Sequence, residues 1–253
     1  EILAAADAIR SADLMQYPLT GTYKAGWNLG EEFVNLYIGL GGEFFESGTA
    51  VVAVNNDKGV AALNMMKQLT SYMHPDYLTV DSAIASPHLT QGQASMGNIW
   101  GSRGSFVLDP AEQVGAVTGN MEFASAATIA GGSTPATTLW WDGFTLATNQ
   151  TDEEAATAFQ VMLEGADGEM VRANNDLAVW LDPAYDPQPA SAGVFASAAA
   201  GAQSYPMLPY MGILHTAFGS NIADFLQGKE SAEQTLTDIT DAYTAGAKEA
   251  GFL

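Results

Sequence analysis

Apolar side chains recur every three or four positions in five long segments of this 253-residue chain, and this spacing limits the fold most strongly. It places apolar groups on one face of a helix, so it predicts helices packed against a shared core. Shorter segments with apolar or alternating character predict strands. We expect helices at 31–40, 59–73, 152–163, 208–226 and 231–250, and strands at 94–100, 115–117 and 138–147. The sequence therefore predicts an α/β fold in which helices surround a small mixed sheet.

Three of the predicted helix ends carry their own local signals. Thr151 and Ser231 each precede a helix and have Glu154 and Gln234 three residues later, which is the pattern of a capping box. The Gly41–Gly42 pair follows the helix at 31–40, and glycine readily adopts the left-handed conformation that ends a helix. These residues fix the expected boundaries more firmly than the apolar spacing does.

The charge and the missing residue types exclude several classes of function. The chain has 29 acidic and 8 basic residues, a net charge of -21, so it repels nucleic acid and anionic lipid. It has no cysteine and no motif for a metal, a nucleotide or a catalytic serine, so no cofactor and no metal are expected. The longest apolar stretches are far shorter than the roughly 20 residues that cross a bilayer.

The order of several motifs resembles the family 1 extracellular solute-binding proteins, the maltose-binding-like sugar receptors of ABC importers. The segment LGGEFF at 40–45 closes a helix, and Asn55 and Asn56 then introduce the helix at 59–73. The segment GQASMGNIW at 92–100 is similar to a strand that leads to an aromatic residue at the sugar cleft in that family.

The resemblance continues through the second half of the chain. The segment LWWDGF at 139–144 stands where the family has a Gly-Gly-Trp hinge strand, and the capped helix from Asp152 follows it. Trp140 and Trp141 replace the paired glycines, and with this change the segment is similar to that of α-glucoside receptors. The segment FLQGK at 225–229 resembles the turn before the closing helix.

The resemblance implies a type II periplasmic-binding-protein-like fold made mainly of the helix-rich C-terminal lobe. Residues 1–143 and 183–253 would form this lobe, and residues 144–182 would return to an N-terminal lobe. The N-terminal lobe is expected to be largely missing from this sequence, and a signal peptide to be absent. Residues 1–253 by themselves would then have weak or undetectable affinity for sugar.

The function that the resemblance implies is binding and not catalysis. The chain would bind an α-glucoside or an oligosaccharide in the periplasm and deliver it to the transmembrane permease subunits of an ABC transporter. Its contact with the membrane complex would be peripheral.

Sugar recognition needs flat aromatic faces and a few polar groups, and the candidates are grouped in the sequence. Trp100, Trp140 and Trp141 fall at the ends of predicted strands, and Trp27 with Asn28 stands at a predicted helix start. The resemblance places Trp100 and Trp141 at the cleft. Burial in the core is the alternative role for each tryptophan.

Three charged or polar side chains complete the candidate ligand-binding set. Asp142 and Arg103 lie beside these aromatic residues in sequence and could bind neighbouring hydroxyls, or form a surface ion pair. His215 lies off the apolar stripe of its helix; the resemblance places it at the cleft, and an ordinary polar helix position is the alternative.

Two other classes of function remain open from the sequence. A glycoside hydrolase would need two acidic residues at the correct separation, and Glu43, Glu46 and Asp142 are the candidates. A structural fragment without a ligand is the other alternative.

Overall fold

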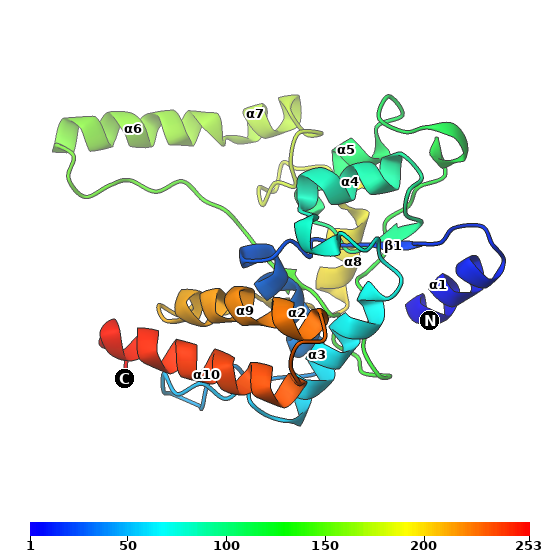
Figure 1. The fold of residues 1–253 in the computed structure, drawn as a ribbon. Helices are drawn as coiled ribbons and strands as arrows, with labels where there is room; N and C mark the ends of the chain where they lie inside the picture. The colour runs from blue at the N-terminus through cyan, green and yellow to red at the C-terminus, as the bar shows by residue number, and fades with distance from the viewer.

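The computed structural model describes all residues, 1–253, and is dominated by helices (Figure 1). No helix combines the length and apolar character that crossing a membrane requires. The helices are α1 (Ile2–Ser11), α2 (Trp27–Gly39), α3 (Asp57–Thr70), α4 (Ser82–Thr90), α5 (Gly104–Leu108), α6 (Asp152–Gly165), α7 (Gly168–Ala173), α8 (Ala192–Ala199), α9 (Met211–Leu226) and α10 (Ala232–Glu249). The strands are β1 (Leu19–Thr20), β2 (Met96–Gly97), β3 (Thr138–Leu139) and β4 (Gln203–Ser204), and four single 3₁₀ turns lie at Tyr77–Thr79, Gly101–Arg103, Gly115–Val117 and Pro189–Ser191.

All five helices expected from the apolar spacing are present, with differences at their ends. Helix α2 begins at Trp27 instead of residue 31, directly after Gly26, whose φ of 98° is outside the helical region. Helix α9 begins at Met211 instead of residue 208. The reason is Pro209, because a proline disfavours the helical conformation in the residue before it.

Two of the three local end signals act as the sequence predicts, and the third does so in part. Thr151 and Glu154 form the reciprocal capping box of α6. Ser231 accepts a hydrogen bond from the backbone N–H of Gln234, although the return bond of a full capping box is absent there. Gly41 has a φ of 68° and ends α2 with the paired hydrogen bonds of a Schellman motif.

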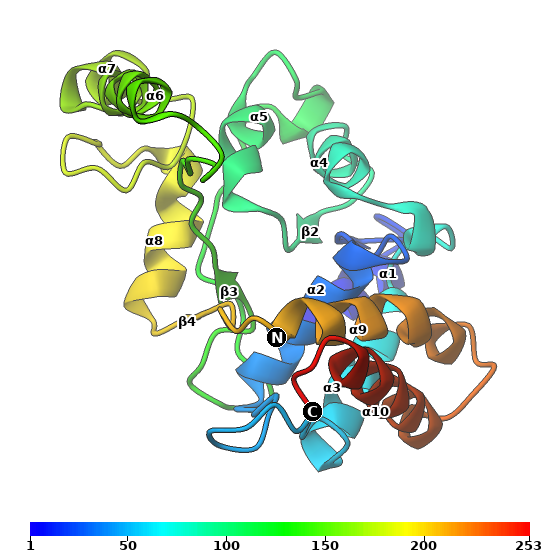
Figure 2. The same cartoon turned by 90° about the vertical axis from the view of Figure 1, so that its left-hand side faces the viewer.

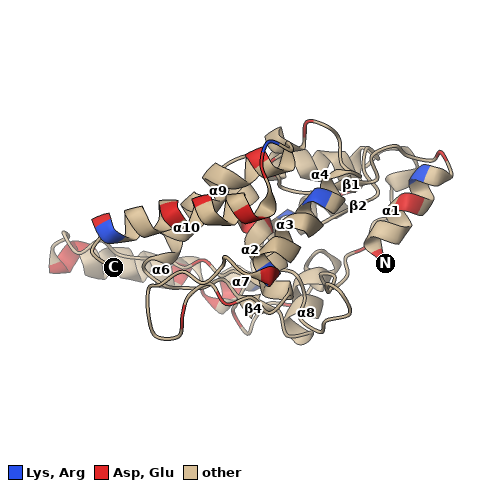
Figure 3. Ribbon diagram, turned by 60° about the horizontal axis from the view of Figure 1, so that its bottom comes forward, with Lys and Arg blue, Asp and Glu red and all other residues tan.

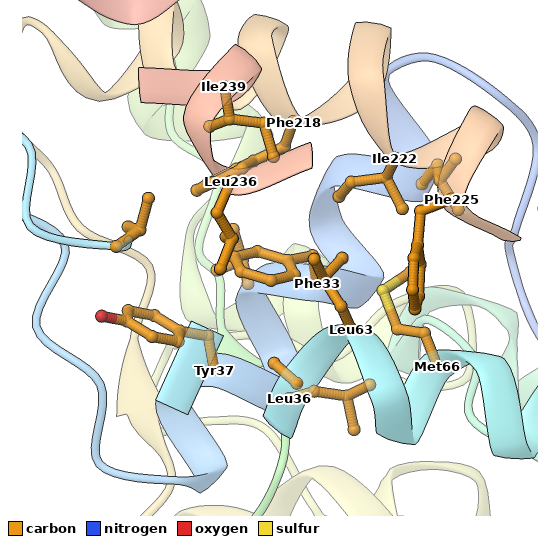
Figure 4. Close-up of a cluster of buried hydrophobic side chains, with 14 of the residues drawn as sticks. Phe33, Leu36, Tyr37, Leu63, Met66, Phe218, Ile222, Phe225, Leu236 and Ile239 are labelled. Atoms are coloured by element: carbon orange, nitrogen blue, oxygen red, sulfur yellow. The ribbon is translucent and has the colours of Figure 1, made fainter. Parts of the chain in front are cut away.

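Helices α2, α3, α9 and α10 pack together around the main hydrophobic core (Figure 2). Phe33 of α2 lies against Phe218 of α9, with 4.6 Å between ring centroids, and both side chains are fully buried. Leu63 of α3 and Leu236 of α10 close the cluster from the other helices (Figure 4). This four-helix core supports the start of α2, where a candidate site residue lies.

The strands differ from the predicted small mixed sheet. They form two separate parallel pairs, β1 with β2 and β3 with β4, each only two residues long. The predicted strands at 94–100 and 138–147 shrink to β2 and β3. The strand predicted at 115–117 is wrong, because Gly115 has a φ of 56° and begins a 3₁₀ turn.

The pairing of β3 with β4 brings together residues that are far apart in the sequence and leaves a long excursion between them. Helices α6 and α7 lie in this excursion and extend along the periphery (Figures 1 and 2). Helix α6 buries none of its residues, and α7 buries only Val171. The segment 144–182, expected to return to another lobe, therefore packs little against the rest of this chain.

Acidic side chains are spread over the molecule, and the few basic ones stand at scattered positions (Figure 3). Two lysine–carboxylate pairs form, Lys24 with Asp81 and Lys229 with Asp224. Exposed pairs of this kind contribute at most about 1 kcal/mol each. The hydrophobic core therefore provides most of the stabilisation.

Candidate functional site

Three of the predicted tryptophans meet at one place. The ring of Trp27, at the start of α2, lies 5.9 Å from that of Trp100 and 5.7 Å from that of Trp140. Trp100 and Trp140 are 5.9 Å apart, measured between ring centroids. Trp100 follows β2 and Trp140 follows β3, so the two strand pairs and α2 carry the three indoles to the same point.

Tyr205 and the buried His215 complete this group. The Tyr205 ring lies 4.1 Å from that of Trp140, and the His215 ring stacks on Trp27 at 4.5 Å. We call these five residues, Trp27, Trp100, Trp140, Tyr205 and His215, the aromatic platform. Its outer side is open, because Trp27 is 49% and Trp140 37% exposed.

Close backbone contacts fix the position of Trp27 over α9. The N–H of Gly26 donates to the carbonyl of Gly219 in α9 at 3.2 Å, and a side chain at residue 219 would collide with Gly26. A side chain at Gly30 would likewise collide with the His215 ring. Two glycines therefore allow α2 and α9 to approach closely beneath Trp27.

His215 is a buried support and is not on the open face, which corrects the expectation that it contacts ligand. Only 1% of it is exposed, and its Nε2 lies 2.8 Å from the carbonyl of Trp27, so this nitrogen donates. Its Nδ1 lies 2.8 Å from the hydroxyl of Tyr205. Burial lowers the pKa of His215, although the bond to Trp27 opposes this. The neutral ring therefore accepts a hydrogen bond from the Tyr205 hydroxyl at Nδ1.

Glu31 is the buried carboxyl beneath the platform, and sequence reasoning did not select it. Its Oε1 accepts hydrogen bonds from the indole N–H of Trp140, at 3.1 Å, and from the hydroxyl of Thr138. Its Oε2 is buried without a partner. Burial raises the pKa of Glu31 to about 7, although the bonds from Thr138 and Trp140 lower it and the charge of Glu32 raises it further.

Spacing was the signal that could have identified these supporting residues. Trp27, Glu31 and Asn35 are four residues apart, so they share one face of α2. Thr138 and Trp140 are two residues apart in an extended segment and also share a face. The Thr138 hydroxyl lies 2.9 Å from Oδ1 of Asn35, so the two faces meet. Tyr205 had no comparable signal.

The remaining candidates lie around or away from the platform. Trp141 is 61% exposed, and no other aromatic ring stacks on it. Asp142 is exposed next to it, and Asn28 is half-buried in the first turn of α2. Arg103 is exposed, with one guanidinium nitrogen 3.5 Å from the hydroxyl of Ser82. None of these four side chains is part of the stacked group.

Two of the three acidic residues considered for hydrolysis are separated from the platform. Glu43 and Glu46 are exposed in the loop after α2, whereas Trp27 begins that helix. The 13 residues of α2 span about 18 Å along its axis. Asp142, by contrast, is two residues from Trp140. The three acids therefore do not form one group.

Comparison with known proteins identifies the fold. No family model matches the chain, and no curated protein matches it. Solved structures do match: an ABC transporter solute-binding protein from Agrobacterium radiobacter K84 in complex with ribitol has a TM-score of 0.78 and 17% identity. The match covers 96% of this chain and 63% of that chain.

Two further neighbours have the same fold. The solute-binding protein from Agrobacterium vitis S4 with bound D-mannitol gives a TM-score of 0.76 at 17% identity, covering 99% of this chain and 66% of that one. The T. maritima MalE3 with bound maltose gives 0.74 at 16% identity, covering 96% and 63%. The fold is thus that of the solute-binding proteins of ABC transporters, and this chain spans about two thirds of their length.

Proposed function

We propose that this chain, whose fold is that of ABC-transporter solute-binding proteins, binds a carbohydrate on its aromatic platform as part of a transport receptor. The observation that carries the proposal is the convergence of Trp27, Trp100 and Trp140. These residues come from three separate parts of the sequence, and two of their indoles are substantially exposed.

Open indole faces suit the C–H face of a sugar ring. An indole offers a large, rigid, apolar surface, and its negative face attracts the weakly positive C–H groups of a pyranose. Polar groups at the rim would then bind the hydroxyls. The candidates for this role are Asp142, Asn28 and Arg103. Asp142 directly follows Trp141 in the sequence, and Asn28 directly follows Trp27. Arg103 stands three residues after Trp100.

The exposed indole faces favour a ring-shaped ligand over an open chain. The indoles of Trp27 and Trp100 are inclined by 28°, and that of Trp140 meets them at 61° and 72°, so the open faces lie at an angle to one another. Each rigid face can pack against the C–H face of a pyranose, which a flexible linear alditol does not present. We therefore propose an α-glucoside or an oligosaccharide. The neighbouring structures contain ribitol, D-mannitol or maltose, so both kinds of ligand must be tested.

The shared fold supports the proposed transport role. In this proposal residues 1–143 and 183–253 form one lobe, and residues 144–182, including the exposed α6, contact a second lobe. The two lobes would close on the ligand, and the loaded receptor would dock on the permease subunits of an ABC transporter in the periplasm. The chain would carry out no chemical reaction on the sugar.

Titration with maltotriose while the indole N–H resonances are recorded tests this proposal. We expect a saturable shift of the Trp27, Trp100 and Trp140 resonances at millimolar sugar, with no new reducing ends. Ribitol and D-mannitol serve as open-chain controls and should shift them less. Unchanged resonances of all three residues would contradict the binding proposal, and release of glucose would favour a hydrolase.

A further inference from the structure

The orientation of Trp140 decides the shape of the whole platform. Its ring contacts those of Trp27, Trp100 and Tyr205, so a change in its tilt alters every open indole surface. Its indole N–H has two acceptors, Oγ1 of Thr138 at 2.9 Å and Oε1 of Glu31 at 3.1 Å.

Glu31 contacts both the indole N–H and its second acceptor. The Thr138 hydroxyl has one proton and two acceptors, Oε1 of Glu31 and, at 2.9 Å, Oδ1 of Asn35. When the hydroxyl donates to Glu31, an oxygen lone pair of Thr138 faces the indole N–H of Trp140. Glu31 thus accepts from the indole N–H directly and also takes part in orienting the second acceptor. Since only 2% of Glu31 is exposed, its carboxyl cannot exchange these bonds for water without moving the chain.

We propose that Glu31 is the positioning residue of the aromatic platform, because Oε1 fixes the indole N–H of Trp140 and so sets the surface that a ligand meets. This inference rests on the proposed sugar-binding function for its purpose. Its geometry is independent of any ligand. Glu31 would not touch the sugar, since only 2% of it is exposed.

The surroundings of Glu31 make this role sensitive to pH. The titratable groups near the carboxyl are Glu32 on the same helix, Tyr205 after β4 and His215 on α9. None of them supplies a positive charge at neutral pH, since burial lowers the pKa of His215. Burial raises the pKa of Glu31 to about 7, so the acceptor strength of Oε1 changes close to neutral pH.

Glu32 supplies a matched control on the neighbouring position. It is also a buried glutamate of α2, but its carboxyl accepts from the backbone N–H and hydroxyl of Thr22, away from the platform. Substitution of Glu32 by glutamine therefore removes a buried acid from the same helix without removing a hydrogen bond to Trp140.

The test is an NMR titration of the Trp140 indole N–H, without sugar, over about two pH units on either side of the Glu31 pKa. In the wild-type chain the resonance should move in one step with a midpoint near pH 7. In Glu32→Gln the step should persist with a lower midpoint, because the charge of Glu32 raises the pKa of Glu31. In Glu31→Gln the resonance should remain fixed, because glutamine retains an acceptor oxygen and does not titrate. A flat wild-type curve, or an unchanged curve in Glu31→Gln, would overturn the proposal.

Ligand binding gives a second, separate readout. We expect Glu31→Ala to weaken maltotriose binding about tenfold and Glu31→Gln to restore it to within roughly twofold of wild type. Equal weakening by Glu31→Gln and Glu31→Ala would contradict positioning through the acceptor oxygen. If wild type does not bind sugar, the proposed function fails, whereas the sugar-free titration still decides the role of Glu31.

Discussion

The indole N–H of Trp140 donates to Oε1 of Glu31 across 3.1 Å, although 109 residues separate the two in sequence. Glu31 lies one helical turn after Trp27, so α2 carries both an open indole and the carboxyl that holds another. This arrangement links the end of β3 to the start of α2. The platform is therefore a connected unit and not a set of independent surface rings.

Replacing Trp27 by alanine should weaken maltotriose binding about tenfold, because it removes a stacking surface worth roughly 1 to 1.5 kcal/mol. The shift of the remaining indole resonances during titration measures this change. Trp180→Phe is the control, since the Trp180 indole donates to Asn174 within its own segment. An equal loss of affinity in both variants would argue against a specific platform.

The free energy of unfolding should fall as the pH rises, because Glu31 loses its proton in a buried position. Its pKa is raised by burial from 4.5 to about 7, so between these values the folded chain holds a proton that the unfolded chain has lost. Stability from this group is therefore complete below pH 4.5 and decreases by about 3 kcal/mol up to pH 7.

Urea unfolding of wild type and Glu31→Gln at several pH values measures this contribution. The variant should gain stability relative to wild type at high pH and lose the advantage in acid. Burial also raises the pKa of Glu32, so Glu32→Gln should change the stability curve in the same direction, while the pH-dependent step of the Trp140 resonance persists. A pH-independent difference between wild type and Glu31→Gln would be inconsistent with this explanation.

Gly30→Ala should disturb the platform from below. The added Cβ would lie 2.9 Å from Cδ2 of His215, which is closer than packed side chains tolerate. Because His215 stacks on Trp27, we expect a changed near-ultraviolet circular dichroism signal from the tryptophans. Gly212→Ala on the exposed side of α9 has free space and should leave the signal unaltered.

Phe218→Ala should destabilise the chain by about 3 to 5 kcal/mol, because it leaves a cavity among fully buried side chains of α2 and α9. The free energy of unfolding in urea measures the loss. Phe195→Ala is a control, since this ring on α8 is 42% exposed. Similar losses in the two variants would mean that α2 and α9 do not form the main core.

The exposed apolar face around α6 should promote self-association. Phe159 and Leu163 are 53% and 51% exposed and lie one turn apart. They line an open apolar hollow with four other side chains, Phe144, Leu146, Met162 and Ala166. Sedimentation velocity should show less association for Phe159→Ser with Leu163→Ser than for Thr157→Ser with Gln160→Ser. No difference between these pairs would show that the hollow does not drive association.

The parts of the fold that could be predicted from the sequence are those that depend on neighbouring residues. Apolar spacing located the main helices, and the capping residues Thr151 and Gly41 located particular ends. The strands were poorly predicted because each pair is two residues long and depends on a distant partner, as for Thr138 with Gln203. Such short segments carry too few residues to show a period.

Only part of the candidate site could be predicted, because some of its residues depend on contacts with distant parts of the sequence. Aromatic type and position identified Trp27, Trp100 and Trp140 as candidates, and the structure brings them together. The sequence did not distinguish Glu31 from the other 28 acidic residues, because its burial depends on the packing of β3 over α2. Tyr205 became visible only through its contact with Trp140.

A crystal structure with maltotriose at saturating concentration would show whether the aromatic platform binds sugar. We expect a glucose ring stacked on the exposed face of Trp27 or Trp140, with carbon atoms about 4 Å from the indole. Its hydroxyls should face polar side chains at the rim of the platform. Maltotriose bound at a site remote from these rings, with the platform indoles covered by other parts of the chain, would refute the sugar-binding role of the platform.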